Sequence, residues 1–150
     1  MENYNKENDA SRERLKQLVK SINDEELKLV IYKEGWTVAA ALGHLAFWDE
    51  RRTRLYKKWM KSDIAPEPVM DFDVLNDALM TVFLKMPPRA AAELAVTCAE
   101  TVDKTIRGLP GEMVLAISRM GDVHALDRGV HRKMHLDEID ALLKGKRKHQ

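Results

Sequence analysis

The stretch GWTVAAALGHLAFWDER, residues 35–51, has the features of a long, buried helix. Thr37 is a suitable N-cap residue, and Trp36 stands where a hydrophobic staple residue would precede it. We expect the helix to run from Thr37 to about Lys61, with one face formed by Ala41, His44, Trp48, Leu55 and Trp59. A histidine therefore lies within the face that this helix would bury.

The rest of the chain is also patterned for helices. Apolar residues recur at helical spacing over three further long segments, at about residues 9–21, 89–108 and 122–143. A shorter helix is predicted at residues 71–86, and the segment 111–121 is ambiguous. Strand signals are weak, because β-branched residues are scattered and no Asn-Gly or Asp-Gly turn separates alternating runs.

Four long helices joined by short connections indicate an all-α fold, a four-helix bundle with one short extra helix. A chain of 150 residues fits one domain, so residues 1–150 are interpreted as a single bundle. The last helix is predicted to start at Asp122, a suitable N-cap, and to end near Leu143. The basic tail at about residues 144–150 is predicted to be flexible.

Composition limits the classes of function. Apolar residues make up 45% of the chain and charged residues 33%, as in a soluble globular protein. Lys and Arg number 25 and Asp and Glu 24, so the net charge of +1 gives no electrostatic case for nucleic acid as a partner. The chain shows no secretory signal and no run of about 18 apolar residues that would span a membrane. A single cysteine, Cys98, excludes an internal disulfide, and we expect a cytoplasmic protein.

A second informative stretch is HRKMHLDEIDALL, residues 131–143. His131 and His135 are four residues apart, which stacks them one turn apart on one helix face. The same face continues to Ile139 and Leu142, so it is predicted to point into the bundle. In helical bundles, metal sites are built from side chains that point inward from facing helices.

Together with His44, this pair makes three candidate metal ligands. Burying three imidazoles without partners would cost about 1–3 kcal/mol for each unmet polar nitrogen, and one cation would satisfy all three. A structural role is the alternative, because a single histidine on an apolar stripe is more often a core residue than a ligand. Zinc, nickel and ferrous iron all suit three imidazoles, which leave a position open for water or substrate.

Three further residues are candidates for the surroundings of this site. Trp48 follows His44 by one turn and either walls a pocket or is a plain core aromatic. His124 lies one heptad before His131, about 10 Å away along a helix axis, so a core or rim role is expected for it. Asp127 lies four residues before His131 and either orients that ring or makes a surface contact.

Two of these segments resemble signatures of the DinB-like, metal-binding four-helix bundles. This superfamily includes the mycothiol-dependent maleylpyruvate isomerase metal-binding domain. Residues 35–51 look like its second-helix signature, in which a Trp opens the helix and a Gly-His pair carries the first ligand. Residues 131–143 look like its last-helix signature, and DVLNDALMTVF, residues 73–83, is similar to its middle segment. The resemblance extends from about Leu15 to Leu143.

The resemblance implies an up-down-down-up bundle, often a homodimer, with one divalent metal ion on His44, His131 and His135. All three ligand positions match. Members of the superfamily include S-transferases and isomerases that use low-molecular-weight thiols, and hydrolases that act against reactive toxins. No additional segment in this chain would supply a thiol-binding half.

An open three-histidine site supports two kinds of enzyme acting on a small-molecule substrate. A metal that activates water would give a hydrolase, and one that binds a thiolate cosubstrate would give a thiol transferase. The ligand set does not choose between them. A non-catalytic metal protein that sequesters a small toxic molecule is an alternative from another class.

Nucleic-acid binding is the least favoured alternative. It is motivated by RRTRLYKKWMK, residues 51–61, which places Tyr56 and Trp59 among six basic residues. A charge run on a long helix is usually a solvated face, however, and Trp59 belongs to the predicted buried stripe.

Overall fold

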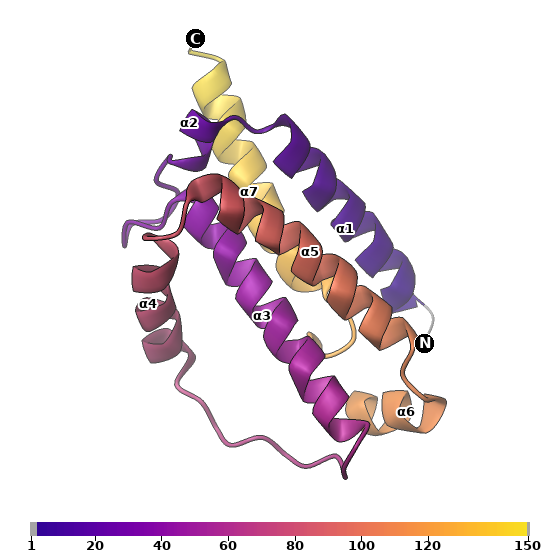
Figure 1. The fold of residues 1–150 in the computed structure, drawn as a ribbon. Helices are drawn as coiled ribbons and strands as arrows, with labels where there is room; N and C mark the ends of the chain where they lie inside the picture. The colour runs from indigo at the N-terminus through magenta and orange to yellow at the C-terminus, as the bar shows by residue number, and fades with distance from the viewer. Residues whose placement is uncertain (1–2, 150) are drawn as a thin grey trace.

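The computed structural model describes residues 3–149, and all regular elements in that range are helices (Figure 1). In chain order they are α1 (Asn3–Ser21), α2 (Asp24–Leu27), α3 (Val38–Trp59), α4 (Phe72–Phe83), α5 (Pro88–Arg107), α6 (Gly111–Arg119) and α7 (Gly129–Arg147). None of these helices is both long enough and apolar enough to cross a membrane.

The four long helices form the predicted up-down-down-up bundle. In Figure 1, α1 and α7 run upward, and α3 and α5 run downward beside each other. The connection that carries α4 returns the chain from the lower end of α3 to the upper end of α5, which makes these two helices parallel. α1 packs against α5 and α7, and α3 also contacts α7.

Small side chains allow α3 and α5 to pack closely. The core between them is rich in fully buried alanines, including Ala39 and Ala46 on α3 and Ala92, Ala95 and Ala99 on α5. The distance between packed helices depends on the side chains at the contact, so alanine on both sides brings the two backbones together. This close pair is the frame on which α3 presents its histidine.

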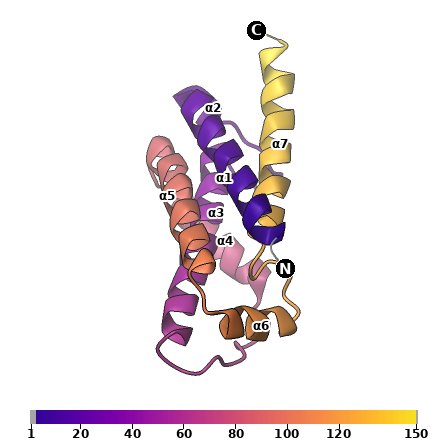
Figure 2. The same ribbon diagram turned by 90° about the vertical axis from the view of Figure 1, so that its right-hand side faces the viewer.

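Besides α4, the structure has two further short helices, α2 and α6. Asn23 and Glu26 form a reciprocal capping box that closes α2. The ambiguous segment 111–121 forms α6, which lies across one end of the bundle (Figure 2). Its apolar side chains join a second core cluster with Tyr56 and Trp59 at the end of α3.

The start of α7 differs from the prediction. Asp122 was expected to cap this helix, but α7 begins at Gly129, and a turn at residues 123–126 precedes it. The cap comes from α1 instead: Asn8 Oδ1 accepts the backbone N–H groups of Arg128 (2.7 Å) and Gly129 (3.1 Å). Asn8 Nδ2 also donates to the Leu126 carbonyl at 2.9 Å. A residue 120 positions earlier in the chain therefore sets where α7 begins.

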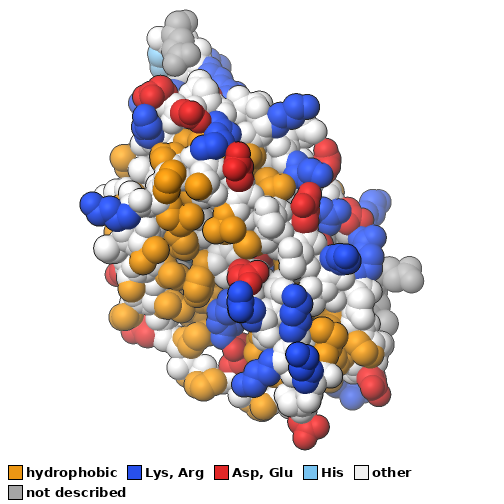
Figure 3. All heavy atoms as spheres, in the orientation of Figure 1, with side chains coloured by type: hydrophobic (Ala, Val, Ile, Leu, Met, Phe, Trp, Pro, Cys, Tyr) orange, Lys and Arg blue, Asp and Glu red, His pale blue; other side chains and the backbone are white. Residues whose placement is uncertain are grey.

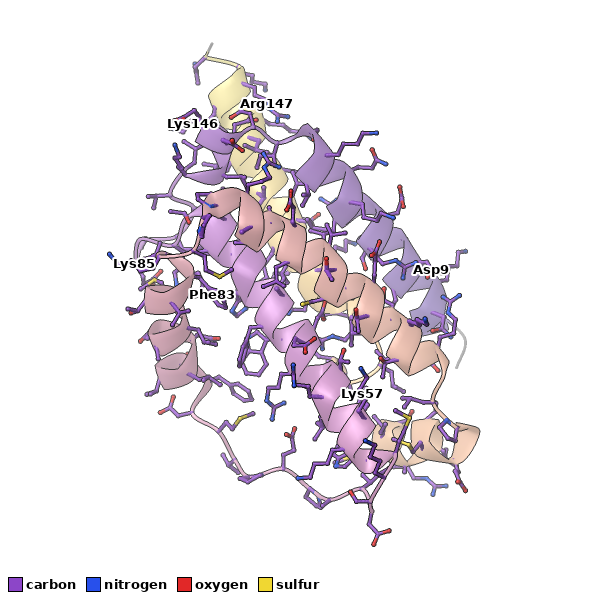
Figure 4. All side chains as sticks on the ribbon, in the orientation of Figure 1. Asp9, Lys57, Phe83, Lys85, Lys146 and Arg147 are labelled. Atoms are coloured by element: carbon purple, nitrogen blue, oxygen red, sulfur yellow. The ribbon has the colours of Figure 1, made fainter. Side chains whose placement is uncertain are left out.

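The end of α7 also lies beyond the predicted boundary at Leu143. The helix continues to Arg147, whose guanidinium donates to both carboxylate oxygens of Glu26 at 2.8 and 3.1 Å. Figure 4 shows Arg147 beside α2 at this end of the bundle. The contact links the last helix to the segment between α1 and α3.

A buried network of ion pairs ties the four long helices together. Arg132 on α7 is fully buried and donates to Asp49 on α3 (3.1 Å) and to Asp103 on α5 (2.8 and 2.9 Å). It also donates to Ser11 on α1 at 3.3 Å. Arg128, one turn earlier, shares Asp49 at 2.8 Å. The network fixes α7 against α3, the two helices that carry the candidate metal ligands.

The shorter helix α4 packs on α3 mainly through Phe83, with Leu79 and Met80 partly buried beside it. Phe83 is its buried residue, and the ring lies directly over Gly43 on α3 (Figure 4). Val82, at the preceding position, is 56% exposed. Gly43 precedes His44, so the contact between α4 and α3 lies beside the candidate site.

Replacing Gly43 with alanine is expected to lower the free energy of unfolding by about 1–3 kcal/mol through overpacking. The added Cβ would lie 2.8 Å from Cδ1 of Phe83, and this penalty outweighs the higher helix propensity of alanine, at most about 1 kcal/mol. Urea denaturation of the purified variants measures the change. Gly145→Ala is the matched control, because nothing lies within 4 Å of its added Cβ. Equal effects at both positions would contradict the close approach of α4.

Candidate metal centre

Three imidazole rings from two helices converge at one point in the bundle. His44 lies near the start of α3, which Thr37 caps by accepting the Ala40 N–H at 3.0 Å. His131 and His135 lie one turn apart on α7. The Nε2 atom of His131 is 3.1 Å from Nε2 of His44 and 3.2 Å from Nε2 of His135. The structure thus brings together the three side chains that the sequence singled out.

The spacing of these nitrogens fits a shared cation. Two ligands about 2.0–2.1 Å from a zinc ion at a tetrahedral angle would stand about 3.3–3.4 Å apart, close to the distances between these Nε2 atoms. A neutral imidazole has one N–H and one lone pair, so three converging Nε2 atoms cannot all satisfy one another. The three side chains could hold a metal ion, since their ligand atoms all lie within 4.8 Å of one another.

Burial keeps these imidazoles uncharged at neutral pH. It lowers the pKa of His44 to about 4, and the nearby His135 adds to the shift. Burial also lowers the pKa of His131 to about 2, with further contributions from His135 and His44. The pKa of His135 is lowered for the same reason. Metal ligation requires neutral imidazole, so the folded protein presents all three in the competent form.

The metal-free protein is expected to lose stability as the pH falls from 7 to 5. The pKa values of about 4 for His44 and about 2 for His131 lie below the value of about 6.5 in the unfolded chain. At pH values between the folded and unfolded pKa, the unfolded chain therefore binds more protons than the folded protein does. Stability is therefore complete above about pH 6.5 and falls toward the folded pKa values, by roughly 4 kcal/mol at pH 5 for the two groups together. Denaturation at both pH values measures it. A His131→Asn variant should show a shallower dependence, and an identical one would contradict this origin.

A family comparison agrees with this geometry. A family model described as the DinB superfamily matches residues 7–140. The chain belongs to the DinB superfamily. The matched range contains all three histidines. No curated protein and no solved structure matches the chain.

The outer nitrogens of the histidines differ in their partners in this DinB-superfamily protein. Nδ1 of His135 lies 2.6 Å from the Tyr32 hydroxyl, whereas Nδ1 of His44 is buried without a hydrogen-bond partner among the described residues. If Nε2 of His135 ligates a metal, its Nδ1 carries the proton and can donate it to the Tyr32 hydroxyl. Burial and the neighbouring Glu138 raise the pKa of Tyr32 well above its usual value, so its hydroxyl stays protonated.

Replacing Tyr32 with phenylalanine is expected to weaken metal binding about tenfold or more, because hydrogen-bond partners of metal-bound histidines typically contribute 10- to 100-fold. Competition with a metal chelator measures the affinity. Tyr56→Phe is the matched control: its hydroxyl donates to the Ala125 carbonyl at 2.5 Å, away from the histidines. That variant should lose stability and keep its metal affinity. An unchanged metal affinity in Tyr32→Phe would contradict the idea that Tyr32 orients His135 for metal binding.

The other three residues singled out from the sequence, Trp48, His124 and Asp127, lie at different places around the histidines. Trp48 lines the cavity beside the histidines, with its ring centroid 6.3 Å from that of His44. His124 is not on α7, and the turn that carries it brings its ring within 6.3 Å of the His131 ring, closer than predicted. Asp127 Oδ1 accepts the Val130 N–H at 3.3 Å, at the start of α7, and no hydrogen bond joins this carboxylate to His131 among the described residues.

The three histidines open onto a cavity of about 550 Å³. Sequence reasoning missed several of its lining residues, among them Tyr32, Arg51, Arg52, Phe72 and Arg128. Tyr32 comes from the irregular segment before α3, where no helical pattern predicts a direction. The two arginines of α3 belong to the run that was interpreted as a solvated face. Cavities of this size hold small organic molecules, so the arrangement combines possible metal ligands with room for a substrate.

Proposed function

We propose that this DinB-superfamily protein binds one divalent metal ion through His44, His131 and His135. We further propose that it acts as a metal-dependent enzyme on small electrophilic molecules. The observation that carries the proposal is the convergence of three Nε2 atoms at the wall of a cavity of about 550 Å³. Three protein ligands leave a position open toward that cavity, which is the arrangement of catalytic rather than structural sites.

A bound divalent cation would supply Lewis-acid activation of a nucleophile, either water for a hydrolase or a low-molecular-weight thiol for a transferase. The chain itself provides the environment. Trp36 and Trp48 place aromatic rings next to His44, with centroids 5.6 and 6.3 Å from its ring, and so exclude water from that side. Tyr32 holds the His135 ring in position. Zinc, nickel and ferrous iron fit three imidazoles about equally well.

Metal loading followed by an activity screen tests the proposal. The protein is stripped with a chelator, reloaded with zinc, nickel or ferrous iron, and assayed with reactive esters and epoxides, with and without thiols. We expect product only from the reloaded protein and not from a His44→Ala variant treated in the same way. Binding of an electrophile without turnover would favour the sequestering role. Failure to take up any of the three metals would contradict the proposal at its base.

The basic stretch of α3 presents few unpaired charges and no exposed aromatic ring that would bind a nucleic acid. Arg51, Arg52 and Arg54 each pair with a carboxylate. Tyr56 is fully buried and Trp59 is 6% exposed, so neither can stack on a base. Nucleic-acid binding is therefore not proposed.

A homodimer is part of the proposal. Its support is the family resemblance together with apolar side chains that α4 leaves exposed, including Phe72, Val74 and Val82. In Figure 3, which has the orientation of Figure 1, apolar side chains gather on the left, where α4 lies. Light scattering of the purified protein measures the assembly state: a dimeric mass that falls to the monomer in Val82→Glu is expected, and a monomeric parent would contradict it.

A further inference from the structure

The cavity beside the histidines contains a second polar feature, the buried guanidinium of Arg128. This side chain is only 3% exposed, yet it lines the cavity. Its Nε donates to Asp49 at 2.8 Å and its Nη1 donates to the His124 carbonyl at 2.5 Å. No hydrogen bond joins its Nη2 to any residue between 3 and 149, and this nitrogen is not among the fully buried atoms that lack a partner, so it is accessible from the cavity.

Arg128 has no carboxylate of its own in the buried network. The connected ion pairs join four arginines to three aspartates, namely Arg12, Arg107, Arg128 and Arg132 with Asp9, Asp49 and Asp103. Arg128 has to share its only carboxylate with Arg132. The surplus positive charge of the network lies with Arg107, whose side chain is 54% exposed. Among the buried members, Arg128 pairs with one shared carboxylate, whereas Arg132 pairs with two.

The other cations of the cavity wall are already neutralised. Arg51 pairs with Glu67, and Arg52 pairs with Asp122 at 2.9 Å. The acidic Glu34 also lines the cavity, but it is exposed, and solvent screens its charge. Arg128 is therefore the point of the wall where an anion would gain most.

The apolar part of the wall is aromatic. Trp36, Trp48 and Phe72 line the cavity, and the Trp48 ring lies 5.6 Å from the Phe72 ring. Planar rings pack on such surfaces through offset or edge contacts. The volume of about 550 Å³ lies in the range of small-molecule pockets.

We propose that this cavity binds a small molecule with an aromatic body and a carboxylate or similar anionic group, the anion hydrogen-bonded to Nη2 of Arg128. The aromatic body packs against Trp36 and Trp48, which leaves the reactive part of the molecule near the histidines. This assignment names the substrate class of the proposed enzyme. That the bound molecule reacts rests on the proposed function, whereas its binding does not. Binding itself needs no metal.

Binding of two matched probes to the metal-free protein tests the proposal. The probes are 3-phenylpropanoate and its neutral counterpart 3-phenylpropanamide, and calorimetry or tryptophan fluorescence gives their dissociation constants. We expect the carboxylate to bind at least about tenfold more tightly, the gain of one charge-assisted hydrogen bond. In Arg128→Gln this preference should disappear while the amide binds as before.

The variants are chosen to keep the fold. Arg128→Gln brings the connected network to equal numbers of arginines and aspartates, and Asp49 keeps Arg132 as its partner. Arg54→Gln, on the exposed side of α3, is the control for the change in net charge and should keep the full preference. If Arg128→Gln does not fold, the comparison of the two probes on the unsubstituted protein still tests the carboxylate preference, and equal affinities there overturn the assignment.

Each outcome has a defined meaning. Equal affinities for the two probes, no binding of either at millimolar concentration, or a preference that persists in folded Arg128→Gln would each overturn the assignment. A preference that appears only after metal loading and is lost in His44→Ala would also overturn it, because the anion would then bind the metal. Metal content, measured separately, reports on the proposed function alone, so either proposal can fail without the other.

Discussion

Replacing Asp49 with asparagine is expected to lower the free energy of unfolding by about 3–5 kcal/mol, the usual cost of breaking a buried ion pair from one side. Asp49 is 2% exposed and is shared by Arg128 and Arg132. Asparagine has nearly the same shape but no charge, so it leaves Arg128 without a carboxylate. Urea denaturation of the metal-free variants measures the loss.

Two further variants isolate the charge as the cause. Glu50→Gln, at the next position of α3, removes a carboxylate that pairs with Arg54 near the surface and should cost less than about 1 kcal/mol. Adding Arg128→Gln to Asp49→Asn removes the unpaired cation and should recover part of the stability. A small effect of Asp49→Asn would contradict this account. So would a double variant whose loss in free energy of unfolding equals the sum of the two single losses.

The second large effect is expected in metal binding. His44→Ala should weaken the affinity by more than about a hundredfold, since the loss of a ligand exceeds the 10- to 100-fold cost of losing a partner that orients one. His131→Ala should have a similar effect, and combining the two should add little, because the remaining imidazoles no longer close the site. Elemental analysis and chelator competition measure both quantities.

His124→Ala is the matched control for this series. Its ring lies 6.3 Å from that of His131 and lines the same cavity, but it is outside the group of three whose ligand atoms converge. We expect this variant to retain about one metal ion per chain. Equal losses in His124→Ala and His44→Ala would mean that the convergence of the Nε2 atoms does not determine binding.

Features that depend on local pattern were predictable from the sequence. The apolar spacing around residues 35–51 indicated the buried helix α3, and Thr37 does cap it. The same spacing placed His44 inward, and the four-residue interval of His131 and His135 placed both on one face. Helical periodicity alone decides these directions, so no knowledge of distant contacts was needed.

Features that depend on distant partners were not predictable. The start of α7 is set by Asn8 on α1, and the local sequence offered Asp122 as a plausible cap instead. The same misplacement put His124 on a helix and thus too far from His131. No local pattern marks Asp49 as buried, because its two arginines come from the far end of the chain. Only the packing of α7 against α3 reveals the buried network and the unpaired donor of Arg128.

The most direct measurement is anomalous X-ray diffraction from crystals of the metal-loaded protein. We predict a single anomalous peak between α3 and α7, with Nε2 of His44, His131 and His135 each about 2.0–2.2 Å from the ion. A metal bound elsewhere, or one held by the α7 pair with the His44 ring turned away, would contradict the central claim.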